Sequence, residues 1–302
     1  MNDDIHNDLL ARNFPSAEED VAAVPLDSRY AGPGSAYRLA FDDSEFLLRE
    51  ELRPVRMQLE LLKPELVQRE HGVEATVVIF GSARIPAREL AQQRVEAARA
   101  DGDTVGLRRA EMQLVMSQHY EEARRFAGMV TTASKRLDQP IAVVTGGGPG
   151  IMEAGNRGAF DAGGPSIGLN IVLPHEQEPN AYITPELCFQ FHYFALRKMH
   201  FLMRAIALVC FPGGFGTLDE MFEALTLMQT GKVRRRPVLL FNREFWTKLV
   251  NFDLLVDTGM ISAEDLTLFH FVESAEEAWG LIERHYALDA GDTTTGPFAE
   301  DC

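Results

Sequence analysis

Apolar residues in this chain gather in short continuous runs, separated by longer segments in which they recur three or four positions apart. The short runs predict buried strands at about 76–80, 141–145, 166–173, 206–211, 237–242 and 268–272. The intervening spacing predicts helices, most clearly over 87–100, 107–137 and 191–205. Strands that alternate with helices indicate an α/β protein, here a Rossmann-like doubly wound parallel sheet with helices on both faces.

The two ends of the chain lack this pattern. Residues 1–40 are acidic, contain several prolines and glycines and show little periodicity, so we expect a disordered or extended acidic arm. Residues 289–302 predict a disordered tail for similar reasons. The α/β domain is therefore expected over 73–288.

An N-terminal helical extension is expected over 41–72. Its apolar stripe has alternating spacings of four and three residues and consists of Leu48, Leu52, Val55, Leu59, Leu62 and Leu66. Pro54 and Pro64 interrupt this stripe, which favours a pair of helices. Two interpretations stay open: the stripe packs against the core of its own chain, or it forms a subunit interface.

The charge balance argues against a nucleic-acid partner. The formal net charge is −16, whereas proteins that bind phosphate backbones present basic surfaces. One dense basic cluster occurs, at Lys232, Arg234, Arg235 and Arg236. It is interpreted first as cations that complement a helix C-terminus, and second as a phosphate or subunit contact.

The remaining composition points to the cytoplasm. No run of about 18 apolar residues is present, so no membrane span is predicted. The acidic start differs from the basic head of a signal peptide. The cysteines Cys188, Cys210 and Cys302 are scattered and odd in number, which favours reduced thiols over a disulfide framework.

Glycine-rich turns follow three of the predicted strands. They contain Gly81 and Ser82; Gly146, Gly147, Gly148 and Gly150; and Gly213, Gly214 and Gly216. In an open parallel sheet such turns lie at one edge, where ligands bind, and a helix N-terminus beside them favours an anion. Neither longer glycine run fits the dinucleotide fingerprint or the P-loop, so a compact mononucleotide site is predicted.

Glu220 is unexpected beside a predicted anion site. One interpretation is structural, because Thr217 and Glu220 have the spacing of a capping box at the start of a helix. The other is chemical, because a fixed carboxylate can stabilise positive charge that develops on a substrate.

A basic pair, Arg197 and Lys198, lies in the otherwise apolar segment that leads into the 206–211 strand. Partly buried cations need an anion, and the candidates here are a phosphate or Glu220. His192 and His200 are not accompanied by carboxylates at metal-ligand spacing. We therefore predict neither a metal nor another cofactor.

Four segments together resemble the LOG ("Lonely Guy") family of Rossmann-like phosphoribohydrolases, often mislabelled as lysine decarboxylases. They are GSAR at 81–84, TGGGPGIMEAGNRGA at 145–159, RKMHF at 197–201 and PGGFGTLDE at 212–220. The resemblance covers about 75–272. It implies an N-glycosyl hydrolase that converts nucleoside 5′-monophosphates into free base and ribose 5-phosphate. It also implies that Arg197 and Glu220 are catalytic.

The same resemblance implies the residues that hold the nucleotide. They are Gly81, Ser82, Gly146, Gly147, Gly148, Gly150, Met152, Glu176, Lys198, Gly213, Gly214, Phe215, Gly216, Thr217, Leu218, Asp219 and Thr226. Glu176 competes with Glu178 for the place of an acidic loop residue of the family. The additional N-terminal residues resemble a longer bacterial subgroup, for which AMP-like substrates are expected more firmly than cytokinin nucleotides. A homo-oligomer is also implied.

Three rival functions remain. A decarboxylase needs a Schiff-base lysine and pyridoxal phosphate, and Lys198 is the lysine near the glycine turns. A carrier of a nucleotide or of the molybdenum cofactor would bind without turnover. A nucleotide sensor would keep the nucleotide-binding site and lose the rate of turnover.

Overall fold

The computed structural model describes residues 14–23, 29–30, 35–137, 139–174 and 178–288. By its internal contacts the chain divides into two units, 1–59 and 60–302. In the first unit, helix α2 (Ala17–Ala23) lies in the predicted acidic arm and buries no residue. Helix α3 (Ser44–Leu47) and the 3-10 helix η1 (Glu50–Leu52) follow. The predicted tail, 289–302, lies outside the described residues.

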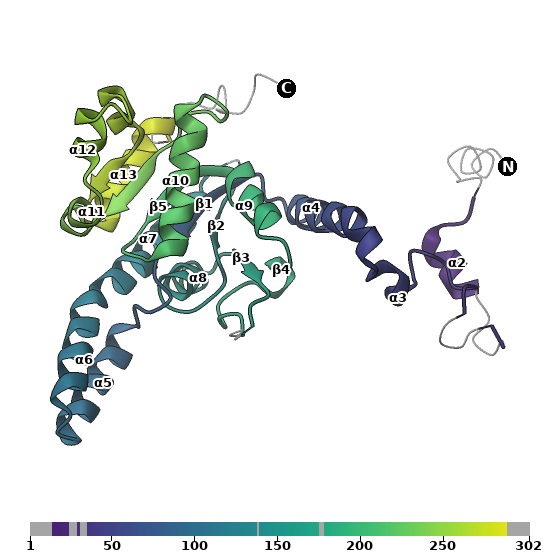
Figure 1. Ribbon diagram of the computed structural model, residues 1–302, viewed down its shortest axis with the longest axis horizontal. Helices are drawn as coiled ribbons and strands as arrows, with labels where there is room; N and C mark the ends of the chain where they lie inside the picture. The colour runs from purple at the N-terminus through teal and green to yellow at the C-terminus, as the bar shows by residue number, and fades with distance from the viewer. Residues whose placement is uncertain (1–13, 24–28, 31–34, 138, 175–177, 289–302) are drawn as a thin grey trace. The chain divides into compact units, whose positions relative to one another are not determined.

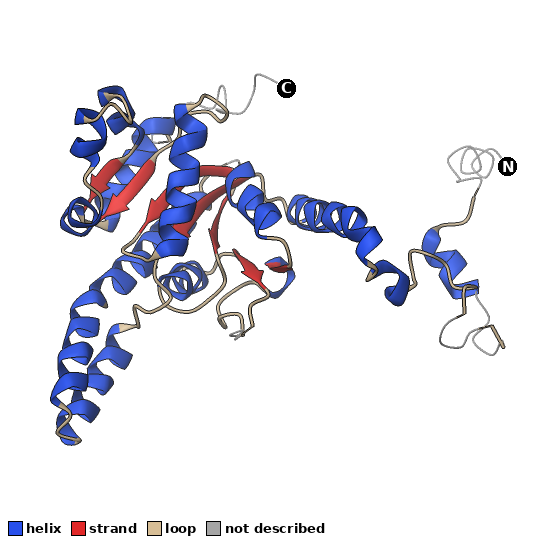
Figure 2. Ribbon diagram, in the orientation of Figure 1, coloured by secondary structure: helices blue, strands red, loops and turns tan. Residues whose placement is uncertain are grey.

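The second unit is built on a seven-stranded sheet in which every strand pairs in parallel, in the order β4-β3-β2-β1-β5-β6-β7 (Figures 1 and 2). The strands are β1 (Ala75–Phe80), β2 (Ile141–Thr145), β3 (Ser166–Ile171), β4 (Cys188–Phe191), β5 (Ala205–Cys210), β6 (Val238–Phe241) and β7 (His270–Val272). The chain builds outward from β1 to β4, then returns to the other side of β1 with β5. The predicted doubly wound fold is confirmed, and its switch point lies between β1 and β5.

Helices cover both faces of this sheet because its strands alternate their apolar side chains between two layers. One layer includes Val77 and Ile79 of β1 and packs against the helices that follow in the chain at 118–134, 151–161 and 275–286. The other includes Val78 and Phe80 and packs against the helices at 194–203, 215–229, 243–249 and 252–257. Cys210 belongs to this second layer and is fully buried, as expected of a small apolar residue, and both Cys188 and Cys210 are free thiols.

Most helices occur where the pattern predicts them. Their bounds are α4 (Arg53–Glu70), α5 (Arg88–Ala100), α6 (Thr104–Met116), α7 (Gln118–Ser134), α8 (Ile151–Asp161), α9 (Phe194–Met203), α10 (Phe215–Gln229), α11 (Arg243–Leu249), α12 (Phe252–Asp257) and α13 (Ala275–Tyr286). Two 3-10 helices, η2 (Pro185–Leu187) and η3 (Ala263–Leu268), complete the list. The single helix expected over 107–137 is two, α6 and α7, which meet at Ser117. Among the described residues, no helix is long and apolar enough to cross a membrane.

The predicted interruption of the helices over 41–72 by Pro54 and Pro64 is wrong. Helix α4 runs without a break through both prolines, with Pro54 in its first turn, where proline is tolerated, and Pro64 inside. The core-packing interpretation of the leucine stripe is also wrong, because Leu59, Leu62 and Leu66 are about half exposed. Other residues of α4, Leu61 and Val67, contact the buried core instead.

The basic cluster does not complement the C-terminus of α10. That helix ends at Gln229 and has no basic residue in its last turn. The cluster belongs to the loop between α10 and β6, whose backbone N–H groups at Lys232 and Val233 donate to the carbonyl of Leu227. The first interpretation of the cluster is therefore wrong.

Candidate active site

The three glycine turns meet at the carboxyl edge of the sheet, at the switch point. The backbone N–H of Ser82, after β1, donates to Pro212 O after β5 (3.1 Å). Ser82 O in turn accepts from the N–H of Ile151, the first residue of α8 (3.1 Å). Gly150 has φ +70°, and a Cβ there would lie 2.4 Å from Ser82 O. The close approach of the first two turns therefore requires glycine at position 150.

A buried polar network holds the second turn. Thr145 Oγ1 accepts from the N–H of Gly147 (3.0 Å) and donates to Asn156 Oδ1 (2.6 Å). Asn180 Nδ2 donates to the carbonyls of Gly147 (3.1 Å) and Gly148 (3.0 Å), and also to Asn156 Oδ1 (2.9 Å). These bonds satisfy backbone groups that a glycine turn leaves unpaired, so the loop is held in one conformation.

This network was not predicted from the sequence. Asn156 lies on the buried side of α8, and Asn170 lies against Gly147, where an added Cβ would be 2.2 Å from Asn170 Oδ1. Asn180 comes from the loop after β3, far from any glycine motif. Asn156 was detectable as a polar residue inside the GNRGA motif, whereas nothing local distinguishes Asn170 or Asn180.

The N-terminus of α10 is open. Its N-cap is Gly214, and among the described residues no side chain caps it and nothing lies within 4 Å of a Cβ added to Gly214 or Gly216. Between them Phe215 is 91% exposed. Since α10 has 15 residues, uncapped N–H groups and the helix dipole make this end suitable for an anion.

The capping-box interpretation of Thr217 and Glu220 is wrong. Helix α10 begins two residues before Thr217, so neither residue holds the capping position. The hydroxyl of Thr217 lies instead over Gly213, where an added Cβ would be 2.1 Å from it. Glu220 is therefore not part of a capping box, although its spacing from Thr217 suggested one.

Glu220 lies on the buried side of α10 and is only 7% exposed. Its Oε2 is fully buried and has no hydrogen-bond partner among the described residues. Burial raises the pKa of Glu220 to about 7, and the positive charges of Lys198 and Arg197 limit that rise. A carboxyl group in this state can exchange a proton near neutral pH.

Lys198 is engaged by two carboxylates of α10. Its Nζ lies 3.0 Å from Asp219 Oδ1 and 2.9 Å from Glu223 Oε2. Although burial lowers its pKa, the carboxylates of Glu223 and Asp219 outweigh that effect, so the pKa of Lys198 is raised. The lysine therefore remains an ammonium that joins α9 to α10.

Arg197 is anchored to backbone rather than to a carboxylate. Its Nε donates to Leu169 O within β3 (2.7 Å), and its Nη2 donates to Gly146 O after β2 (3.4 Å). The guanidinium also lies over the ring of Phe201, 5.1 Å from its centroid. Arg197 makes no ion pair with Glu220, but the two charges lie near enough to influence each other. Burial, which lowers the pKa of Arg197, outweighs the opposing effect of Glu220.

The other predicted residues fall into two groups. Met152 lies over the second turn, since Cβ atoms added to Gly146 and Gly148 would meet its side chain at 2.7 and 2.8 Å. Thr226 lies about three turns along α10 from the open end, and its hydroxyl donates to Phe222 O (2.7 Å). The structure thus gathers the glycine turns, Met152, Arg197, Lys198 and Glu220, and leaves Thr226 apart.

The two candidates for the acidic loop residue are Glu176 and Glu178. Glu176 lies outside the described residues, whereas Glu178 is described and exposed. Leu218, a further predicted residue, is half-buried and packs against the core layer of α10.

Comparison with known proteins identifies the family of this chain. A family model described as "Possible lysine decarboxylase" matches residues 152–282. The chain is 31% identical over 160 residues to the cytokinin riboside 5′-monophosphate phosphoribohydrolase LOG1 of Arabidopsis thaliana, covering 51% of this chain and 72% of that protein. It is 32% identical over 171 residues to LOG7 of the same plant, covering 55% and 75%.

Solved structures give weaker likenesses. A molybdenum cofactor binding protein from Rippkaea orientalis matches with a TM-score of 0.44 and 15% identity, over 70% of this chain and 97% of that chain. A molybdenum cofactor carrier protein from Chlamydomonas reinhardtii matches with a TM-score of 0.42 and 19% identity, over 71% and 99%.

Proposed function

Since the chain belongs to the LOG family, we propose that it hydrolyses the N-glycosidic bond of nucleoside 5′-monophosphates, giving the free base and ribose 5-phosphate. AMP-like nucleotides are the proposed substrates, and cytokinin riboside 5′-monophosphates, the named substrates of the relatives, are a narrower possibility within that class. We place the reaction in the cytoplasm and in an assembly of at least two copies.

One observation carries this proposal: a buried carboxylate, one oxygen of which has no hydrogen-bond partner among the described residues, lies near an open helix N-terminus. Glu220 supplies the carboxylate, and Gly214 to Gly216 leave the end of α10 uncovered. The helix N-terminus favours a negatively charged group of the ligand, whereas the carboxylate favours a positively charged one. A nucleotide satisfies both, because it carries a phosphate at one position and develops positive charge at another.

The chemistry follows from the bond that breaks. When the bond from C1′ to the base nitrogen lengthens, positive charge builds on the sugar, as in glycoside hydrolysis. An ionised Glu220 offsets that charge and accepts a proton from the water that forms the new C1′–O bond. With a pKa of about 7, it can do so at neutral pH. The base leaves with the electron pair of the broken bond and is then protonated.

Arg197 is assigned the opposite charge in this scheme. Two carbonyls, Leu169 O and Gly146 O, fix the guanidinium without neutralising it. A phosphate at the glycine turns would therefore meet a pre-oriented cation as well as the N-terminus of α10. Because Arg197 also lowers the pKa of Glu220, it helps keep that carboxylate ionised.

Decarboxylation is not supported by the lysine at the site. A Schiff base forms from a neutral amine, whereas Asp219 and Glu223 hold Lys198 as an ammonium. A non-catalytic carrier would not need a buried carboxylate whose ionised form is unfavourable. The proposed hydrolysis uses both features.

One assay tests the proposal. The purified chain is incubated with AMP, CMP, GMP, UMP and isopentenyl-AMP, and free base is separated by chromatography. Release of adenine from AMP is expected, together with an equal amount of ribose 5-phosphate. Saturable binding of all five nucleotides without release of any base would overturn the proposal and identify a carrier.

A further inference from the structure

A cavity of about 350 Å³ lies at the opposite edge of the sheet from the glycine turns. The loop after α10, the start of β7 and the last turns of α13 line it. Its polar lining, apart from Thr267, consists of Arg235, Arg236, His270, Arg284 and His285. Pro237 directly precedes β6 and His270 begins β7. The cavity is therefore at the amino ends of the strands and is separate from the proposed active site.

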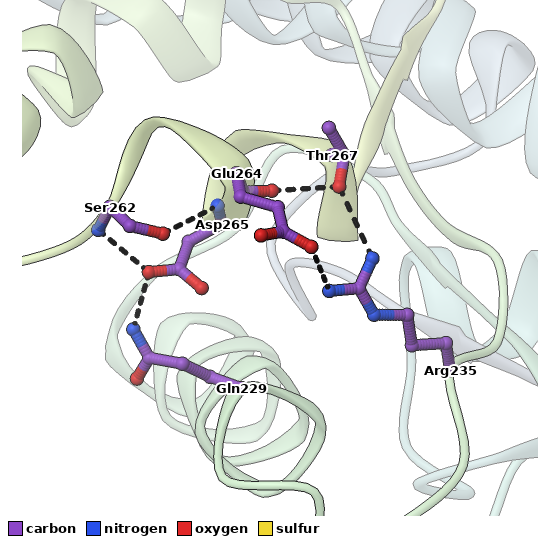
Figure 3. A network of polar contacts seen from close by, with 6 residues as sticks. All are labelled: Gln229, Arg235, Ser262, Glu264, Asp265 and Thr267. Carbon is purple, nitrogen blue, oxygen red and sulfur yellow. Dashed lines mark hydrogen bonds and ion pairs between the residues drawn. The ribbon is translucent and has the colours of Figure 1, made fainter.

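Positive charge in this cavity is unusual for such an acidic chain. The sequence has 45 acidic and 29 basic residues, yet none of the described residues that line the cavity is acidic. Two carboxylates of η3, Asp265 and Glu264, make polar contacts in this region. Figure 3 shows Asp265 bonded to Ser262 and Gln229, while Glu264 pairs with Arg235 (3.2 Å). Arg235 is still more than half exposed.

The other two guanidinium groups that line the cavity belong to Arg236 and Arg284. Arg236 donates to Leu202 O (3.2 Å) and to Ala205 O, carbonyls that orient it without cancelling its charge. In the described part of the chain, no carboxylate lies within ion-pairing distance of Arg236 or Arg284. Burial lowers the pKa of His285, and the nearby His270 lowers it further. Apart from the pair of Arg235 with Glu264, no ion pair among the described residues offsets the positive charge of the three arginines in this cavity.

Helix capping accounts for only part of this arrangement. Arg284 and His285 lie in the last turn of α13, where cations complement the helix dipole. Arg235, Arg236 and His270 belong to no helix terminus, and α10 has no basic residue in its last turn. Their convergence on one cavity therefore needs another explanation.

We propose that this cavity is a second anion site, which binds a small phosphorylated metabolite. Guanidinium groups match the geometry of phosphate oxygens and form charge-assisted bonds with them. The volume falls within the range of small-molecule sites. Met228, Leu268 and Leu281 provide an apolar wall for the organic part of such a ligand.

Histidine side-chain NMR tests this assignment on the full chain. Inorganic phosphate, pyrophosphate and AMP are titrated separately, with sodium chloride at matched ionic strength as the reference. The variants H270Q and H285Q identify the two resonances by removing them. Both resonances are expected to shift saturably with the phosphate compounds, because the bound anion lies beside the imidazoles.

The arginine variants test whether the arginines of the cavity bind the anion. Arg284→Gln should weaken binding about 10- to 100-fold, the loss expected for one charge-assisted contact. Arg109→Gln is the matched control, since Arg109 is an exposed arginine of α6 and should leave binding unchanged. If Arg284→Gln alters the thermal melt, H270Q replaces it, because that change leaves α13 intact.

The possible results of these titrations support or overturn the proposed anion site. Tighter binding of AMP than of phosphate supports a metabolite with an organic part, and equal binding supports a site for free phosphate. Shifts that sodium chloride reproduces, or that Arg284→Gln leaves intact, overturn the site. The AMP titration uses the Glu220→Gln variant, which is expected to bind AMP without hydrolysing it, so a failure here is distinct from a failure of the proposed hydrolysis.

Discussion

Replacing Glu220 by glutamine removes one buried negative charge while keeping the shape of the side chain. The pKa of Glu220 is raised from its ordinary value of 4.5 to about 7, chiefly by burial. The folded state therefore binds this proton more tightly than the unfolded state. Its stabilising effect is complete below about pH 4.5 and is lost as the pH rises through about 7.

The size of this effect follows from the two pKa values. The difference between 4.5 and about 7 corresponds to about 3 kcal/mol, at about 1.4 kcal/mol for each pKa unit. Above pH 7 the wild-type chain carries this penalty and the glutamine variant does not. Glu220→Gln should thus be more stable than wild type at pH 8, with a Tm higher by about 6 °C, and similar to it near pH 4.5.

Turnover should change in the opposite direction. Loss of one preorganised charge at a developing cation costs about 10²- to 10³-fold in rate. The variant should still bind AMP while it releases almost no adenine. In the wild-type chain, kcat/KM should rise with pH through about 7, because the ionised form of Glu220 is the active one.

The assay combines thermal melts from pH 5 to 8 with measurement of adenine release. Glu244→Gln is the control, because Glu244 is fully exposed on α11 and pairs only with Lys248. It should change neither stability nor turnover appreciably. Turnover by Glu220→Gln within about threefold of wild type would refute the catalytic assignment. A variant destabilised at pH 8 would refute the reasoning about buried charge.

Three further predictions concern the substrate, the turns and the assembly. Adenosine should react at least about tenfold more slowly than AMP, because it lacks the charge-assisted bonds of the phosphate; equal rates, measured by chromatography, would exclude a phosphate at the glycine turns. Gly150→Ala should cost several kcal/mol in a denaturant titration, whereas Gly259→Ala, also at positive φ but with nothing within 4 Å of its Cβ, should cost only about 1–2 kcal/mol. Light scattering should give a mass at least twice the 33.7 kDa of one chain, and glutamates at Leu62 and Leu66 should reduce it; a monomeric wild type would contradict the proposed assembly.

The sheet was predictable because its strands are continuous apolar runs, buried on both sides. All six predicted strands lie within about two residues of their expected bounds, and β3, β6 and β7 are shorter than predicted. The missed strand, β4, lies at the sheet edge and alternates, with Gln190 exposed between buried Phe189 and Phe191. Four residues with this pattern do not differ from a loop in sequence.

The site was predictable only where its residues belong to a motif. Arg197, Lys198 and Glu220 were found, and their chemical roles stay predictions. The pairing of Arg197 with backbone carbonyls could not be predicted, because it depends on where β2 and β3 end relative to α9. The same limit explains Asn180, which reaches the second turn from a loop 32 residues away from Gly148.

The position of β1 has a consequence for the order of events during synthesis. Ser82, at its end, is hydrogen-bonded to Pro212 and to Ile151, residues made long after it. A ribosome that has completed β1 to β4 has therefore produced a half-sheet with an unfinished edge at β1, and that edge is exposed until β5 emerges and pairs with it. Appearance of nucleotide binding in a nascent chain would thus mark the moment at which its two halves join.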